Sequence, residues 1–194
     1  GEVLAACCEN APITLYDPVR GQRIRGFRTH PGVAICLEVS PDGSRVASGG
    51  SDRAVRLWNM TTGECEVTWT GHEAFVSGVA WHPVQPAVVT ASADGSLRWW
   101  RLDGSDCRVL EAGGPPLRAI ALGSEGRVAV AGGDDGVVGL WDLDAGRHLR
   151  WLRGHGSTVT CMAMLADVVA AGADDGTVRL WNADSGELLR VMRL

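Results

Sequence analysis

The 194-residue sequence predicts an all-β fold built from one repeated unit. The first observation is a register of aromatic residues that are 42, 42, 41 and 40 positions apart: Tyr16, Trp58, Trp100, Trp141 and Trp181. The second is a polar turn residue six positions before each aromatic: Asn10, Asp52, Asp94, Asp135 and Asp175. A period of about 40 to 45 residues made of short strands and turns is typical of a β-propeller.

Each unit is predicted to contain four short strands. The second unit has the clearest pattern, with runs at 33–39, 45–48, 54–58 and 64–70 that are bounded by Gly, Asp, Asn or Pro. The Asp-Gly pairs at 94–95, 135–136 and 175–176 predict hairpin turns, because glycine tolerates the positive φ of a tight primed turn. A helical period is absent throughout, so we expect essentially no helix.

The units divide the chain into residues 1–29, 30–71, 72–113, 114–154 and 155–194 of a single domain. Residues 3–8 match the second strand of a unit, which means that the first unit lacks its inner strand. An open array would expose apolar blade faces, and closed propellers have roughly four to eight blades. We therefore expect a segment of a larger ring or of a double propeller, with a closed five-bladed ring as the alternative.

Composition excludes several classes of protein. The net charge of −5 and pI near 5.5 disfavour general nucleic-acid binding, which needs a basic face. All 18 basic residues are arginine, and the run between Arg20 and Arg28 is interpreted as a solvated strand face. Neither a membrane span nor a signal peptide is predicted, because apolar runs are short.

The six cysteines occupy strand positions. Four of them recur at equivalent places in the repeat: Cys36, Cys65, Cys107 and Cys161. Such places are expected to be slots for small apolar side chains, as are Cys7 and Cys8 in the first strand. No C-x-x-C with a second ligand pair is present, so we expect no metal site and reduced thiols in a cytosolic or nuclear compartment.

Several motifs recur in order and at a constant spacing. They are Thr-Gly-His at 70–72, Trp-His-Pro at 81–83, Thr-Ala-Ser-Ala-Asp at 90–94 and Leu-Arg-Trp-Trp at 97–100. Gly-His at 154–155 and Trp-Asp at 141–142 belong to the same pattern. In these motifs the chain resembles the WD-repeat (WD40) family over nearly its whole length. Asn59, Arg101 and Asn182 replace the aspartate that follows the family's tryptophan.

The resemblance implies a buried hydrogen-bonded set in each blade, made of His, Ser or Thr, Asp and Trp. Carried over by position, two sets are complete: His30, Ser48, Asp52 and Trp58, and His72, Thr90, Asp94 and Trp100. The last unit keeps His155, Asp175 and Trp181, and the unit before it keeps only Asp135 and Trp141. The set satisfies every buried polar group, because the indole only donates and a hydroxyl both donates and accepts.

Two catalytic interpretations of these residues are rejected. His, Ser and Asp also form hydrolase triads, but here the set recurs in every blade, ends at a tryptophan and has no G-x-S-x-G elbow. The paired carboxylates at 134–135 and 174–175 lie in repeated hairpin turns, where a structural role is expected in place of calcium binding. We therefore predict no enzyme activity, no catalytic residue and no cofactor.

By the same resemblance, one face of the disc is expected to bind partners. Its residues precede the turn aspartates or lead into the inner strands: Ser51, Ala93, Asp134, Asp174, Glu73, Phe75, Val33 and Thr158. Phe75 is a candidate anchor for a partner, and packing between blades is its alternative role. Trp69, Trp81, Trp99 and Trp151 are interpreted as inter-blade core.

We expect a protein-interaction scaffold in a cytoplasmic, cytoskeletal, ciliary or nuclear assembly. The expected partners are other proteins, with no small-molecule substrate, membrane or nucleic acid. The alternatives are a substrate receptor of a ubiquitin ligase and a nucleic-acid-associated factor. Receptors that dock on a cullin adaptor often carry arginine three residues after the motif tryptophan. This chain has Thr61, Asp103, Asp144 and Asp184 at those positions, which counts against the receptor alternative.

Overall fold

The structure, a computed structural model, describes residues 3–7, 12–27, 30–104, 107–111 and 113–193. These residues contain nineteen β-strands and no helix, which confirms the all-β prediction. Asn10 and Cys8 of the sequence analysis lie outside the described residues.

The strands form five antiparallel sheets, in each of which a strand pairs with the next one along the chain. The first sheet has β1 (Leu4–Ala6), β2 (Ile13–Asp17) and β3 (Gln22–Phe27). The second has β4 (Ala34–Val39), β5 (Arg45–Gly50), β6 (Val55–Asn59) and β7 (Cys65–Trp69). The third has β8 (Val76–Trp81), β9 (Ala87–Ser92), β10 (Leu97–Arg101) and β11 (Cys107–Glu111).

The fourth and fifth sheets repeat this arrangement. The fourth has β12 (Leu117–Leu122), β13 (Val128–Gly133), β14 (Val138–Asp142) and β15 (Arg147–Leu152). The fifth has β16 (Val159–Leu165), β17 (Val168–Ala173), β18 (Thr177–Asn182) and β19 (Leu188–Arg193). Only the first sheet is three-stranded among the described residues, as predicted for a unit without its inner strand.

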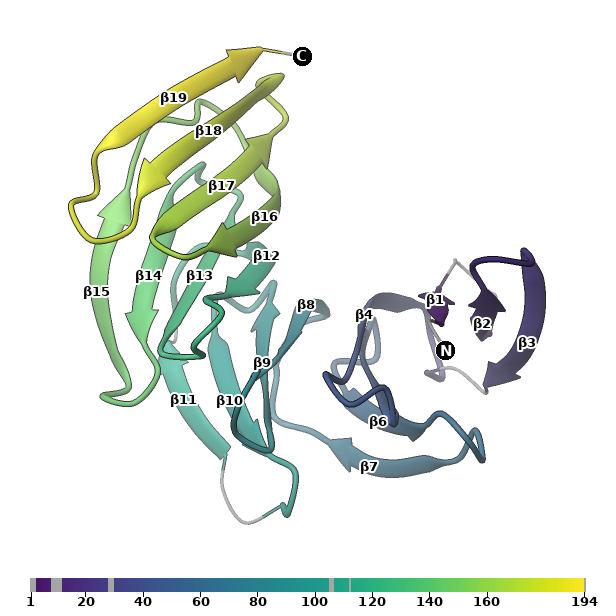
Figure 1. The fold of residues 1–194 in the computed structure, drawn as a ribbon. Helices are drawn as coiled ribbons and strands as arrows, with labels where there is room; N and C mark the ends of the chain where they lie inside the picture. Colours follow the sequence, from purple (N-terminus) through teal and green to yellow (C-terminus); the bar gives the residue numbers. More distant parts are fainter. Residues whose placement is uncertain (1–2, 8–11, 28–29, 105–106, 112, 194) are drawn as a thin grey trace.

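The sheets follow one another along an open arc (Figure 1). The first strands of neighbouring four-stranded sheets lie in contact, β4 with β8, β8 with β12 and β12 with β16. The sheet of β1–β3 and the sheet of β16–β19 are the two ends of the arc and do not meet (Figure 1). The alternative of a closed five-bladed ring is therefore wrong, and further blades that complete a ring stay a prediction.

The hydrophobic core is divided among the junctions between sheets. At the last junction, Val138, Leu140 and Leu152 of the fourth sheet pack against Val169 and Trp181 of the fifth. Equivalent clusters, each with its register tryptophan, fill the other three junctions. Because a buried tryptophan removes a large apolar area from water, the repeated tryptophan supplies much of each junction's stability.

Three tight turns depend on glycine. Gly95, Gly136 and Gly176 have φ of 75°, 71° and 73°, in the left-handed region where a Cβ costs free energy. Each follows the turn aspartate of its unit, so the repeated Asp-Gly pair closes the hairpin between the second and third strands of its sheet.

One tryptophan lies elsewhere than predicted. Trp69, Trp81 and Trp99 are 9%, 7% and 5% exposed and lie between sheets, whereas Trp151 is 47% exposed. Successive residues of a strand point to opposite faces, and in β15 the residue that enters the core is Leu152, which is 1% exposed. The interpretation of Trp151 as inter-blade core is therefore wrong.

The cysteines differ in burial. Burial raises the pKa of the Cys36 thiol to about 12, and its Sγ lies 3.6 Å from the Val76 carbonyl oxygen. Cys65, Cys107 and Cys161 are exposed. These three positions are therefore not apolar slots, and only Cys36 fits that expectation among the four recurring cysteines.

Candidate functional site

The first complete set joins β5 and β6 to the loop before β4. His30 Nδ1 lies 2.7 Å from Asp52 Oδ1, and His30 Nε2 lies 2.8 Å from Ser48 Oγ. The indole of Trp58 donates to the same hydroxyl at 2.8 Å. A continuous direction of donation follows: the indole donates to Ser48, Ser48 to Nε2, and Nδ1–H to the carboxylate.

The second set repeats this geometry one blade later. His72 lies 3.0 Å from Asp94 Oδ2 and 2.7 Å from Thr90 Oγ1. Trp100 donates to Thr90 at 2.9 Å. Asp94 also accepts from the Glu73 backbone N–H at 2.8 Å, which ties the set to the loop between β7 and β8.

The electrostatics of both sets follow from burial. Burial lowers the pKa of His30 and of His72, although the partner carboxylates oppose the shift. For Asp94 burial acts in the raising direction, but hydrogen bonds from Ser96 and the Glu73 N–H prevail and lower its pKa to about 2. The imidazoles are therefore held neutral beside ionised carboxylates, which suits them to a structural network.

The last sheet has a modified set. With Ala171 in place of the hydroxyl, His155 Nε2 lies 3.1 Å from the Ala171 carbonyl oxygen. A carbonyl only accepts, so Nε2 is the donor here, the reverse of its role in the complete sets. Nδ1 faces Asp175 Oδ2 at 3.2 Å and Arg179 Nη1 at 2.8 Å. No acceptor for the Trp181 indole N–H lies among the described residues.

The structure does not bring Asp135 and Trp141 into one set. Asp135 accepts from the Val137 N–H at 3.0 Å and is exposed. The Trp141 indole donates at 3.3 Å to Glu111, on the outer strand of the preceding sheet. With Ala131 in place of a hydroxyl, no acceptor lies at the usual position. The expectation that these two residues share a hydrogen-bonded set is therefore wrong.

The residues expected to bind partners lie at one end of the strands, which we call the upper face. Backbone hydrogen bonds link them in pairs: Ser51 N to Val33 O, Ala93 N to Phe75 O, and Asp174 N to Thr158 O. The side chain of Ser51 also accepts from Val33 N at 2.9 Å. Glu73 and Asp174 are exposed, and Phe75 is half-buried. The repeated pairing places these loops side by side.

Arg118, which the sequence analysis missed, contacts two of the upper-face residues. Its guanidinium lies 5.3 Å from the Phe75 ring centroid and contacts Asp134 through two hydrogen bonds of 2.6 and 2.8 Å. A hollow of about 420 Å³ is lined by Arg118, Asp134, Thr158, Thr160 and Asp174. The sequence feature that could have pointed to Arg118 is an arginine at the strand position where other repeats have Ile35, Ser77 and Thr160.

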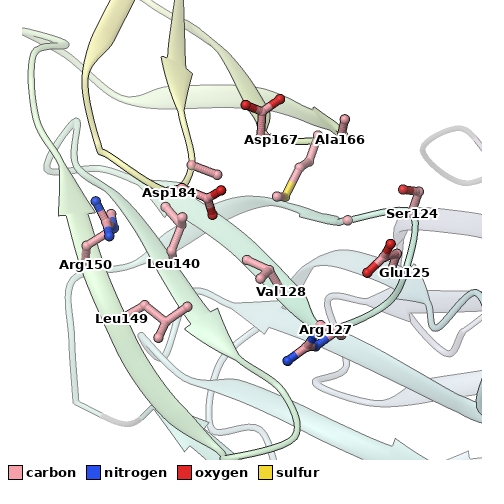
Figure 2. Close-up of a pocket in the computed structure, with 13 residues that line it drawn as sticks. Ser124, Glu125, Arg127, Val128, Leu140, Leu149, Arg150, Ala166, Asp167 and Asp184 are labelled. Carbon is pink, nitrogen blue, oxygen red and sulfur yellow. The ribbon is translucent and has the colours of Figure 1, made fainter.

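A larger groove lies at the opposite end of the strands, between the fourth and fifth sheets (Figure 2). Its volume is about 610 Å³. Val128, Leu140 and Leu149 line it on the fourth sheet, and Asp167 and Asp184 line it on the fifth. Nothing in the sequence analysis pointed to this groove, because it arises from small residues and a short loop at one junction.

Sheets of antiparallel strands that follow one another along an arc, with a tryptophan of each four-stranded sheet inserted into the junction before it, define a β-propeller repeat protein. Four segments of the chain match the WD40 family, WD domain, G-beta repeat: residues 21–59, 63–101, 104–142 and 146–182. These segments cover most of the sequence, and the chain belongs to the WD40 family.

Each matched segment spans two sheets. The segment 63–101, for example, contains β7 of the second sheet and β8, β9 and β10 of the third. The other three segments are divided in the same way. Every repeat therefore joins the outer strand of one sheet to three strands of the next, which couples neighbouring blades through the chain.

Curated relatives share this repeat. The chain is 29% identical over 141 residues to human angio-associated migratory cell protein, with 71% of the chain and 32% of the relative covered. It is 31% identical over 169 residues to the Dictyostelium discoideum periodic tryptophan protein 2 homolog, covering 84% of the chain and 18% of the relative. It is 27% identical over 143 residues to Chlamydomonas reinhardtii cilia- and flagella-associated protein 52, covering 73% and 23%.

The matched part of the chain thus spans a third or less of each of these three relatives. The described residues contain no helix of the length and apolar character needed to cross a membrane. They also contain no group of three or more His, Cys, Asp or Glu side chains arranged to hold a metal ion.

Stability should fall as the pH is lowered from 8 to about 5. The pKa of His72 lies below its ordinary value of 6.5 in the folded state. As the pH falls, His72 is therefore protonated at a higher pH in the unfolded chain than in the folded one, and protonation favours unfolding. His30 shifts in the same direction. Urea unfolding at both pH values measures the loss, and His72→Gln should flatten the pH dependence. An equal pH dependence in the variant would contradict the assignment.

Proposed function

We propose that the chain is a non-catalytic protein-interaction scaffold that binds partner proteins through its upper face. The observation that carries this proposal is the contact of Arg118 with Phe75 and Asp134. It gathers an aromatic ring, a cation and a carboxylate from two sheets beside a hollow. Aromatic and arginine side chains on a rigid surface are the residues that most often dominate protein–protein binding.

Burial of the hydrogen-bonded sets supports the non-catalytic part. Ser48 and Thr90 are 0% exposed, so no substrate can approach either hydroxyl. Each hydroxyl also accepts from a tryptophan, an arrangement that a nucleophile does not need. The sets are better suited to hold loops at fixed positions, and the surface that they support is the functional feature.

We further propose a role in a cytoskeletal or ciliary assembly. The support is the relative in Chlamydomonas reinhardtii, which is named for cilia and flagella. Imaging of the tagged natural protein in ciliated cells tests this role, and exclusion from cilia and from the cytoskeleton would contradict it.

Replacing Phe75 with alanine should remove partner binding while the fold persists. The half-buried ring supports Arg118, so its loss exposes the guanidinium to solvent and disorganises the patch. Quantitative affinity purification from ciliated cells, with wild-type and Phe75→Ala chains, should give at least about a tenfold lower recovery of specific partners for the variant.

The matched control is Trp151→Ala, which removes an aromatic ring that is 47% exposed on an outer strand. This variant should retain the partners. Thermal melting separates binding from folding: a Phe75→Ala chain that melts far below wild type would assign the ring to the core, and unchanged partner recovery would reject the upper face as the binding surface.

A further inference from the structure

The groove between the fourth and fifth sheets exists because this junction carries less side-chain volume than the one before it. Leu140 occupies the place that Trp99 holds one residue before its register tryptophan, and Ala183 occupies the place of Leu143. Trp99 and Leu143 are 5% and 1% exposed and fill their junction. Both replacements are smaller, so the later junction is left hollow.

A third replacement opens the same space. His82, in the loop after β8, packs on Trp99 with ring centroids 5.0 Å apart. It lies so close to Gly126 that a Cβ there would be 2.3 Å from the imidazole. Gly123 occupies the equivalent place in the next unit. The groove therefore lacks the ring that closes the preceding junction.

The loop between the first two strands of the fifth sheet is short and leaves the groove uncovered. From the first residue of the inner strand to the first residue of the second strand, the three earlier four-stranded sheets use 11 positions, as from Leu117 to Val128. The fifth sheet uses 9, from Val159 to Val168. Its turn is made by Ala166, at a φ of 50°, and Asp167. A positive φ at alanine is strained, so this tight turn is held by its surroundings.

The open groove has apolar walls and charges of both signs. Leu149 is 41% exposed at its edge. Arg127 and Arg150 come from the fourth sheet, as does Glu125 in the loop before β13, and Asp167 and Asp184 come from the fifth sheet (Figure 2). Among the described residues, neither Arg150 nor Asp184 has an ion-pair partner. Two unpaired charges of opposite sign beside an apolar surface are complementary to a ligand that carries a positive charge, a negative charge and an apolar group.

We propose that this groove docks an extended peptide segment of a partner protein, in which a large apolar side chain stands between a basic and an acidic residue. The apolar side chain enters the space beside Leu140 and Leu149, the basic residue pairs with Asp184, and the acidic residue pairs with Arg150. A volume of about 610 Å³ accommodates such a side chain with its neighbours, since ligand sites range from about 300 to 1,000 Å³. This surface is separate from the upper face.

Fluorescence polarisation with labelled synthetic peptides tests the proposal. The probes are Gly-Ser-Arg-Phe-Glu-Ser-Gly and the same peptide with Arg and Glu exchanged. Together they test both directions in which a peptide can lie in the groove. At least one should bind the wild-type chain at least about tenfold more tightly than versions with two Arg, two Glu or Ala for Phe. Equal binding of all the peptides would overturn the proposal.

Two variants locate the binding. Asp184→Arg should weaken binding of the preferred peptide by about tenfold or more. Glu64→Arg, an equal charge reversal at an exposed position of the β6–β7 loop, is the matched control and should bind as wild type. Gly123→His should place an imidazole in the groove, where a Cβ meets nothing nearer than Met164 at 3.5 Å, as His82 does at the equivalent place of the preceding unit.

Three outcomes overturn the proposal: full binding by Asp184→Arg, full binding by Gly123→His with an unchanged melting temperature, or equal losses in Glu64→Arg. A second copy of the chain in the groove would instead produce concentration-dependent sedimentation that Gly123→His abolishes. That result would also overturn the assignment to a partner peptide.

Discussion

Replacing His72 with alanine should lower the free energy of unfolding by about 2 to 4 kcal/mol, from unsatisfied buried polar groups and a cavity. The imidazole contacts Thr90 at 2.7 Å and Asp94 and Ser96 each at 3.0 Å. Its removal leaves the Thr90 hydroxyl without its acceptor and weakens the hold on the loop that carries Glu73. Urea unfolding of the two chains measures the difference.

His155→Ala is the matched control, because Ala171 stands in the fifth sheet where the third sheet has the Thr90 hydroxyl. Asp175 would keep the Gly156 N–H at 3.0 Å, Thr177 at 2.5 Å and Arg179 at 2.9 Å. Both variants leave a cavity, so the loss should be smaller than that of His72→Ala by about 1 kcal/mol, close to the contribution of one hydrogen bond. Equal losses in the two variants would mean that the hydroxyl link does not contribute to stability.

Replacing Gly95 with alanine should destabilise the chain by about 3 kcal/mol or more, because two penalties combine there. The residue has a φ of 75°. A Cβ would also lie 2.0 Å from the Gly114 carbonyl oxygen, which is backbone and cannot turn away. The loop before β12 must therefore move, and thermal melting should report a clear loss.

The control for this change is Gly176→Ala, at the same turn position of the fifth sheet. Its φ is 73°, and a Cβ would meet nothing within 4 Å. Only the conformational cost of about 1 kcal/mol should appear. Similar melting temperatures for the two variants would mean that the contact with Gly114 is absent in solution.

The periodic features were the ones that the sequence could predict. The spacing of Trp58, Trp100, Trp141 and Trp181 and the Asp-Gly turns predicted strands, turns and sheets that recur in the structure. Such features are local or repeat with the unit, and a period-2 strand needs only alternation and a turn to define it. The three-stranded first sheet of the described residues was predictable for the same reason.

The site differs from the prediction where the contacts of a side chain depend on residues from other segments of the chain. Trp141 donates to Glu111 of the preceding sheet because Ala131 removes the local acceptor. Trp151 is exposed because the alternation of β15 sends Leu152 inward. Arg118 has its role only through Phe75 and Asp134, which lie in the loops before β8 and after β13. The contacts of Trp141 with Glu111 and of Arg118 with Phe75 join two units, so no spacing within one unit encodes them.

The sequence by itself determined the repeated unit, its four-stranded pattern and its tryptophan register, because hydrophobic periodicity and turn chemistry act along the chain. Only the tertiary structure decided which junctions are filled and which are open. The groove beside Leu140 depends on the combined volume of Gly123, Ala183 and the shortened turn at Ala166. Packing sums contributions from separate segments, so the space at a junction exists only after the sheets have come together.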